Sequence, residues 1–110
     1  MKCPCGLGPS YEKCCGRYIE RHELPPTPEA LMRSRYTAFT RLNHDYLQKT
    51  QTRPLGPLDP HIHWISLTVL KAEGNEVEFI AKYQYEGKKG ELREKSTFHQ
   101  YDGRWVYLSK

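Results

Sequence analysis

The sequence contains no cysteine after position 15 and no long hydrophobic run. Hydrophobic residues make up 37% of the chain, and no segment approaches the roughly 18 consecutive apolar residues that a membrane-spanning helix requires. No apolar stretch follows the first methionine, so the signature of a secretory signal peptide is missing. We therefore expect a cytoplasmic protein that does not enter the membrane and keeps its thiols reduced.

The sequence also lacks a strong charge of one sign. Its formal net charge is +4, and near the N-terminus the basic residues Lys13 and Arg17 are interleaved with the acidic residues Glu12 and Glu20. Proteins that hold nucleic acid usually present a continuous basic stripe to the phosphates. RNA or ribosome binding is therefore an alternative function rather than the favoured one.

The four cysteines form two pairs that lie close together in the chain, Cys3 with Cys5 and Cys14 with Cys15. Four thiolates around one point are the ligand set of a closed, tetrahedral zinc site. Two glycines between the pairs allow the tight turn that would bring them together. We predict that the four cysteines bind one zinc ion. The alternatives are disulfides and redox-active thiols.

The segment around the second cysteine pair is expected to be helical. Ser10 could cap a turn over residues 11–15, and Gly16 would end it. Because four thiolates leave no open coordination position, we expect a structural rather than a catalytic metal ion. Such a rigid feature would present a possible interaction surface made of Tyr11, Lys13, Arg17 and Tyr18.

The pattern C-x-C-G-x-G-x-x-Y-x-x-C-C-G closely resembles the SEC-C motif. This motif is best known as the zinc-binding tail of the SecA translocation ATPase, where it contacts the chaperone SecB and the ribosome. The resemblance implies that the four cysteines are zinc ligands and that the partner is a protein of the chaperone, translation or export machinery. In the usual motif lysines follow the second glycine, whereas this chain has Pro9 and Ser10 there, a difference that bears on the contact surface and not on the metal ligands.

A boundary is expected at the pair Pro25-Pro26, which favours extended chain. It separates residues 1–24, the metal-binding motif and its connector, from a second domain over residues 25–110. This domain begins with the start signals of a helix, a capping Thr27 followed by a proline.

The second domain is predicted to be α+β. We expect a helix over residues 28–43, a short helix over 45–50 and an irregular, proline-containing loop over 51–60. Four β-rich runs with turn residues between them then predict an antiparallel sheet, with strands over 62–71, 77–85, 91–101 and 105–108.

Two turns fix the expected register of the last three strands. A two-residue loop at Asp102-Gly103 would pair Phe98 with Tyr107. A loop at Lys88-Lys89 would pair Tyr83 with Glu94. One face of the sheet is then mostly apolar and should face the helices, and Glu94 is its exception.

The first helix also carries a charged residue on its apolar side. At about 100° per residue, Arg35 falls in the middle of the apolar stripe. The opposite side of this helix carries the polar residues Arg33, Thr37, Thr40 and Arg41. Because an unpaired buried charge is very costly, we predict an ion pair between Arg35 and Glu94, joined by the hydroxyl of Tyr83 or Tyr36. The pair either fixes the helix on the sheet or lines a ligand pocket.

The segments TPEALMRSRYTAF, VEFIAKYQYEGKKGELREKSTF and DGRWVY are similar to the YchJ-like family of bacterial proteins. This family joins an N-terminal SEC-C motif to a small domain with the cone-shaped fold of nuclear transport factor 2 and ketosteroid isomerase. The resemblance covers nearly the whole chain. It implies two helices packed on a curved four-stranded antiparallel sheet, behind an N-terminal zinc-binding knob.

The favoured function is a zinc-dependent adaptor that recruits a protein partner. The main alternative is an enzyme or small-ligand binder with a pocket around Glu94, and such a protein would show a partly polar cavity there. His61 and His63 share one strand face and could bind a second metal ion, but the sequence shows no third ligand. Catalysis is therefore not favoured.

Overall fold

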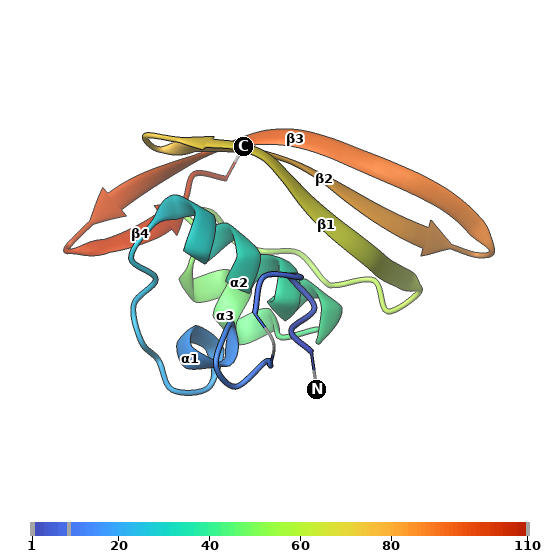
Figure 1. Cartoon of the computed structure of the whole chain (residues 1–110), viewed down its shortest axis with the longest axis horizontal. Coiled ribbons are helices and arrows are strands. Elements are labelled where there is room, and N and C mark those ends of the chain that lie inside the picture. The colour runs from blue at the N-terminus through green and yellow to red at the C-terminus, as the bar shows by residue number, and fades with distance from the viewer. Residues whose placement is uncertain (1, 9, 110) are drawn as a thin grey trace.

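The computed structural model describes residues 2–8 and 10–109. Three helices are followed by four strands, in the order α1 (Gly16–Ile19), α2 (Pro28–Thr40), α3 (His44–Lys49), β1 (Ile62–Glu73), β2 (Glu76–Tyr85), β3 (Lys88–Tyr101) and β4 (Arg104–Tyr107). The strands form one antiparallel sheet in the order β1-β2-β3-β4. The sheet curves over the helices in a second layer (Figure 1). The predicted α+β class is confirmed.

Helix α2 begins and ends at local signals in the sequence. The Thr27 hydroxyl accepts a hydrogen bond from the backbone N–H of Ala30 at 3.1 Å, as the sequence predicts. The helix ends at Thr40, three residues earlier than expected, because Leu42 adopts a left-handed conformation with φ 54°. Asn43 then caps α3 by accepting from the N–H of Tyr46 at 3.0 Å, so α3 starts one residue before the predicted position.

The strand register differs from the prediction at one turn. The β2–β3 turn lies at Glu86-Gly87, which have φ values of 50° and 81°, and not at Lys88-Lys89. A mirror-image turn needs positive φ at both central residues, and glycine supplies one without strain. Tyr83 therefore faces Gly90, while Glu94 faces Phe79. The slip is an even number of residues, so the predicted inner face is preserved.

The turn at Asp102-Gly103 is confirmed. Phe98 pairs with Tyr107 across β3 and β4. Tyr107 also bonds to the segment after α3, because its N–H donates to the carbonyl of Thr50 at 2.8 Å and its own carbonyl accepts from the N–H of Thr52 at 3.1 Å. The C-terminal strand thereby connects the sheet to the end of α3.

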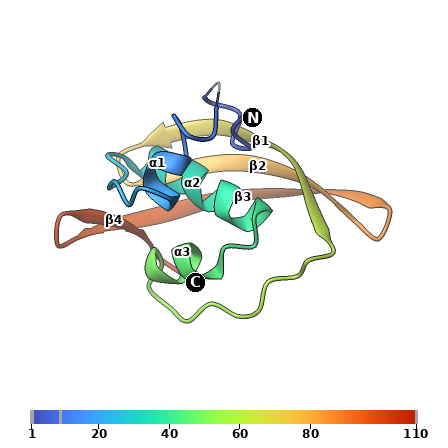
Figure 2. The same cartoon turned by 90° about the horizontal axis from the view of Figure 1, so that it is seen from below.

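The buried side chains form two groups, and both include residues of α2. One group lies between α2 and the sheet and contains Leu31, Met32, Val77 and Phe98. The other joins the N-terminal segment to α2 and α3, and it includes all four cysteines. Figure 2 shows the N-terminal segment and the helices lying on the same side of the sheet. The division into two domains between residues 24 and 25 remains a prediction. Side chains from both sides of this boundary belong to the second group.

Candidate functional site

The four cysteine sulfurs converge on one point beside α2. All their ligand atoms lie within 4.8 Å of one another, and the sulfurs of Cys5 and Cys14 are 3.5 Å apart. A tetrahedral ion with metal–sulfur bonds of about 2.3 Å places its sulfurs about 3.8 Å apart. All four side chains are buried. The cluster could therefore hold a metal ion with little movement.

Two backbone features bring the cysteine pairs together. Gly6 has φ 82°, and its N–H donates to the carbonyl of Cys3 at 3.1 Å. At Gly8, an added Cβ would lie 2.6 Å from the Cβ of Cys14 and 2.9 Å from its sulfur. The loop thus passes so close to Cys14 that only glycine fits at position 8.

The turn that carries the second pair is capped as predicted but continues differently. The hydroxyl of Ser10 accepts a hydrogen bond from the N–H of Lys13 at 3.3 Å. Helix α1 begins at Gly16, where the sequence predicts an end. The N–H of Gly16 donates to the carbonyl of Tyr11 at 2.7 Å, and a Cβ at position 16 would lie 2.7 Å from that oxygen. This glycine is therefore needed for close approach rather than for ending a helix.

The thiols of the cluster strongly affect one another's ionisation. A hydrogen bond from the Cys15 thiol lowers the pKa of Cys5 to about 4. Burial raises the pKa of Cys14 to about 11, and the hydrogen bond to Cys5 raises the pKa of Cys15 above its usual range. Four adjacent buried thiolates therefore require a cation to balance their charge. The donor set fits a thiophilic metal ion.

Helix α2 supports the cluster from outside. The Thr37 hydroxyl lies 3.7 Å from the sulfur of Cys3, and the guanidinium of Arg33 donates to the carbonyl of Cys5 at 2.9 Å. Sequence reasoning missed both contacts. These residues belong to the polar side of the helix, and Thr37 is nevertheless 0% exposed. A polar stripe at four-residue spacing, next to a segment with few apolar residues of its own, is the signal that could have revealed them.

Two of the four residues of the predicted interaction surface are buried, so this prediction is wrong for them. Tyr11 is 6% and Tyr18 7% exposed. The Tyr11 hydroxyl donates to Glu20 at 2.9 Å, and the guanidinium of Arg41 lies 4.2 Å from the centre of its ring. The aromatic rings fill the space between the cysteine loop and the helices. They stabilise the fold instead of presenting a docking surface.

The remaining residues of that surface are accessible. Lys13 is exposed, and Arg17 is half-buried, with its Nε donating to the carbonyl of Cys14 at 3.0 Å. The loop between the cysteine pairs also exposes Leu7 by 63%. Pro9, one of the two departures from the SEC-C pattern, lies outside the described residues.

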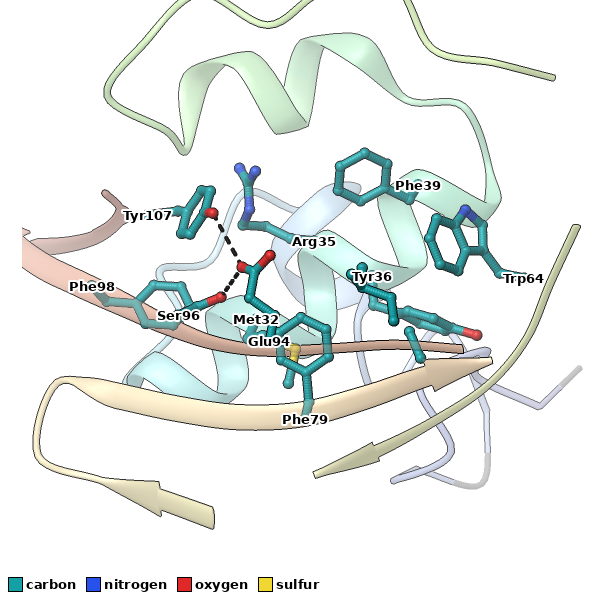
Figure 3. Close-up of a pocket in the computed structure, with 12 residues that line it drawn as sticks. Met32, Arg35, Tyr36, Phe39, Trp64, Phe79, Glu94, Ser96, Phe98 and Tyr107 are labelled. Carbon is teal, nitrogen blue, oxygen red and sulfur yellow. Dashed lines mark hydrogen bonds between the residues drawn. The ribbon is translucent and has the colours of Figure 1, made fainter. Parts of the chain in front are cut away.

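A cavity of about 280 Å³ lies between α2 and the inner face of the sheet (Figure 3). Its walls are mostly aromatic and aliphatic, and its polar groups gather at one end. The lining residues are Met32, Arg35, Tyr36, Phe39, Trp64, Phe79, Ala81, Leu92, Glu94, Ser96, Phe98 and Tyr107. Trp64 contacts the rings of Tyr36 and Phe39, with centroids 6.0 and 6.2 Å away. The cavity is thus an apolar box with one polar end.

The predicted ion pair between Arg35 and Glu94 is not formed. Arg35 donates to the carbonyl of Leu47 at 2.9 Å, to the hydroxyl of Thr50 at 2.7 Å and to the side chain of Gln51 at 2.7 Å. These acceptors belong to the end of α3 and its following turn, which lie nearer than the sheet. Burial lowers the pKa of Arg35 to about 10, so the guanidinium remains charged at neutral pH.

Glu94 points into the cavity and is linked to Arg35 through Tyr107. One carboxylate oxygen accepts hydrogen bonds from the hydroxyl of Ser96 and from that of Tyr107 at 3.2 Å. The Arg35 guanidinium lies 4.8 Å from the centre of the Tyr107 ring. The predicted link through the hydroxyl of Tyr83 or Tyr36 is therefore wrong; Tyr107 lies between the two charged groups instead, with its hydroxyl on Glu94 and its ring against Arg35. Tyr83 packs against Trp64 with a centroid separation of 5.7 Å, and it is not part of the cavity wall.

Among the described residues, no third ligand lies near His61 and His63 to complete a second metal site. His61 is exposed, and its ring lies 3.0 Å from the carboxylate of Asp59; His63 is exposed too. Within residues 2–8 and 10–109, the cysteine cluster is the one group of three or more side chains placed to bind a metal ion. In the same part of the chain, no helix is both long and apolar enough to cross a membrane.

Comparison with known proteins agrees with this architecture. The family model described as "YchJ, middle NTF2-like domain" matches residues 27–110. A UPF0225 protein of Deinococcus radiodurans is 43% identical over 111 residues, covering 96% of this chain and 85% of the relative. A UPF0225 protein of Streptomyces coelicolor is 45% identical over 116 residues, which cover 96% of this chain and 90% of the relative.

Two solved structures extend the likeness over the cysteine segment. The solution structure of a SEC-C motif containing protein from Rhodopseudomonas palustris has a TM-score of 0.81 at 32% identity and covers 99% of this chain and 96% of that one. The crystal structure of a SEC-C motif containing protein from Psychrobacter arcticus has a TM-score of 0.76 at 23% identity, with 99% and 81% covered, and it supports the fold alone. The chain therefore belongs to the YchJ-like family of UPF0225 proteins, with a SEC-C cysteine cluster in front of an NTF2-like domain.

Proposed function

We propose that the protein binds a small, mainly apolar molecule in the cavity between α2 and the sheet. The observation that carries this proposal is a cavity of about 280 Å³ with an aromatic wall and a carboxylate at one end. Pockets that combine apolar walls with a few convergent polar groups are the usual form of small-ligand sites. A partly polar cavity around Glu94 is also the feature expected of the ligand-binding alternative.

The test of this proposal uses a neutral fluorescent probe, N-phenyl-1-naphthylamine, which brightens in apolar surroundings. We expect saturable binding to the wild-type protein. Ala81 lies in the cavity wall and is 1% exposed, so Ala81→Phe should fill the space and abolish binding. Ala72 is exposed on β1, and Ala72→Phe is the matched control that should bind normally. Equal binding by a folded Ala81→Phe protein would place the probe elsewhere and refute the proposal.

We further propose that the metal ion of the cysteine cluster is Zn²⁺ and that its role is structural. Four thiolates are a preferred ligand set of zinc and leave no position for a substrate. Bound zinc would hold the N-terminal segment against α2, where Thr37 and Arg33 contact the cysteine loop. Elemental analysis of the reduced, purified protein should find one zinc per chain. A protein that stays metal-free in excess Zn²⁺ would refute this assignment.

The adaptor function remains a second proposal, on a smaller surface than the sequence suggests. It is favoured by the exposure of Leu7, at 63%, and of Lys13, which both lie between Cys3 and Cys15. The partner would be a protein of the chaperone, translation or export machinery. Capture of a defined partner should be lost with Leu7→Ser and kept with Leu70→Ser, a matched change at an exposed leucine on β1. Binding that rises steeply as salt is lowered would instead indicate RNA.

A further inference from the structure

One carboxylate oxygen of Glu94 is free to bind a ligand. Its Oε2 atom accepts from Ser96 and Tyr107, whereas no donor among the described residues bonds to Oε1. The described chain has no buried side-chain oxygen without a partner, so Oε1 is accessible. In Figure 3 this oxygen points away from Ser96 and Tyr107. An occupant of the cavity would therefore meet a strong acceptor with no competing donor from the protein.

A positive charge, that of Arg35, lies near Glu94 and is linked to it through Tyr107 without forming an ion pair. The Arg35 guanidinium is held by three acceptors around the end of α3 and contacts the same Tyr107 whose hydroxyl bonds to Glu94. The polar end of the cavity thus contains one negative and one positive charge. A cationic ligand would lose its hydration without a net negative charge to replace it. An anionic ligand would meet the free oxygen of Glu94 directly.

The remaining wall selects for a flat apolar body. Trp64 contacts the rings of Tyr36 and Phe39 around one part of the cavity, and Phe79 and Leu92 of the sheet line it too. The volume of about 280 Å³ lies just below the range of pockets for drug-sized ligands, which is about 300–1,000 Å³. One or two fused rings would fill it.

Building on the proposed function, we infer that the ligand is a neutral, flat, mainly apolar molecule that donates a hydrogen bond from an O–H or N–H group to Oε1 of Glu94. The aromatic wall binds its body, and Glu94 determines which polar group it carries. Ser96 and Tyr107 keep the carboxylate in place, and Arg35, which lies against the Tyr107 ring, is the nearby positive charge.

Four probes with one ring system test this inference by isothermal titration at neutral pH. They are 2-naphthol, 2-methoxynaphthalene, 2-naphthylmethylammonium and 2-naphthoate. We expect 2-naphthol to bind about 10- to 100-fold more tightly than 2-methoxynaphthalene, as a hydrogen bond to a charged acceptor implies. The methyl group makes the ether more apolar, so hydrophobic transfer alone would favour the opposite order. Both charged probes should bind more weakly than 2-naphthol.

Substitution of the acceptor completes the test. In Glu94→Leu the preference for 2-naphthol over its ether should vanish, and in the milder Glu94→Gln it should fall by at least threefold, with folding checked by circular dichroism. Equal binding of naphthol and ether to the wild type would overturn the inference and leave the proposed function standing. Tightest binding of the ammonium probe, or an unchanged preference in a folded Glu94→Gln protein, would overturn it as well. Failure of all four probes to bind would instead count against the proposed function itself.

Discussion

Substitution of one glycine should separate the cysteine cluster from the rest of the fold. In Gly8→Ala, the new Cβ would lie 2.6 Å from the Cβ of Cys14 and 2.9 Å from its sulfur. Non-bonded carbon atoms normally approach to about 3.5–4.0 Å. Cys14 or the loop must therefore move by about 1 Å, whereas metal–ligand distances tolerate only about 0.2 Å.

The size of the effect follows from this overlap. Forcing an extra methyl group into a packed site costs about 1–3 kcal/mol. If the strain falls only on the metal-bound form, zinc binding weakens by about 5- to 150-fold. Gly56→Ala is the matched control, because a Cβ at position 56 has no neighbour within 4 Å. We expect the control to bind zinc as the wild type does.

The assay is competition for Zn²⁺ with a coloured chelator, followed by thermal unfolding with and without zinc. Gly8→Ala should lose zinc to the chelator at a lower chelator concentration, and zinc should raise its Tm less than that of the wild type. Wild-type zinc affinity in Gly8→Ala would refute the cluster geometry. An equal loss in Gly56→Ala would show that the assay reports loop flexibility and not the contact with Cys14.

Three further predictions concern groups around the cluster and the cavity. Thr37→Val removes the hydroxyl next to Cys3 and should weaken zinc binding by about tenfold, as loss of an outer-shell partner does; chelator competition measures it. Arg35→Met leaves the acceptors at the end of α3 without a donor and should lower the free energy of unfolding by about 3 kcal/mol in urea; an unchanged midpoint would contradict this. Burial raises the pKa of Tyr46 to about 12 from 10.0. Its contribution to the free energy of unfolding is therefore complete below pH 10 and is lost as the pH rises toward 12. Tyr46→Phe should therefore lose less stability between pH 9 and 11 than the wild type, and equal losses would refute the assignment.

Local features of the sequence predict much of the structure. The cysteine cluster is predictable because its ligands and the glycines between them lie within one short segment. Capping by Thr27 and the turn at Asp102-Gly103 are likewise decided by neighbouring residues. The inner face of the sheet follows from two-residue alternation, even though the β2–β3 turn lies elsewhere than predicted.

Features that depend on tertiary packing are not predictable in the same way. The polar side of α2 looks like a solvent-facing surface until the N-terminal segment packs on it and buries Thr37. Arg35 and Glu94 both lie in the helix–sheet interface, as predicted, but the end of α3 lies closer to Arg35 and supplies its acceptors. Periodicity assigns a residue to a face, but the choice among acceptors on that side depends on tertiary packing.

The most direct test is a crystal structure of the zinc-loaded protein with 2-naphthol. The account predicts the naphthol ring between α2 and the sheet, against Trp64, with its hydroxyl within hydrogen-bonding distance of Oε1 of Glu94. Naphthol bound outside this cavity, or inside it with its hydroxyl turned away from Glu94, would contradict the account.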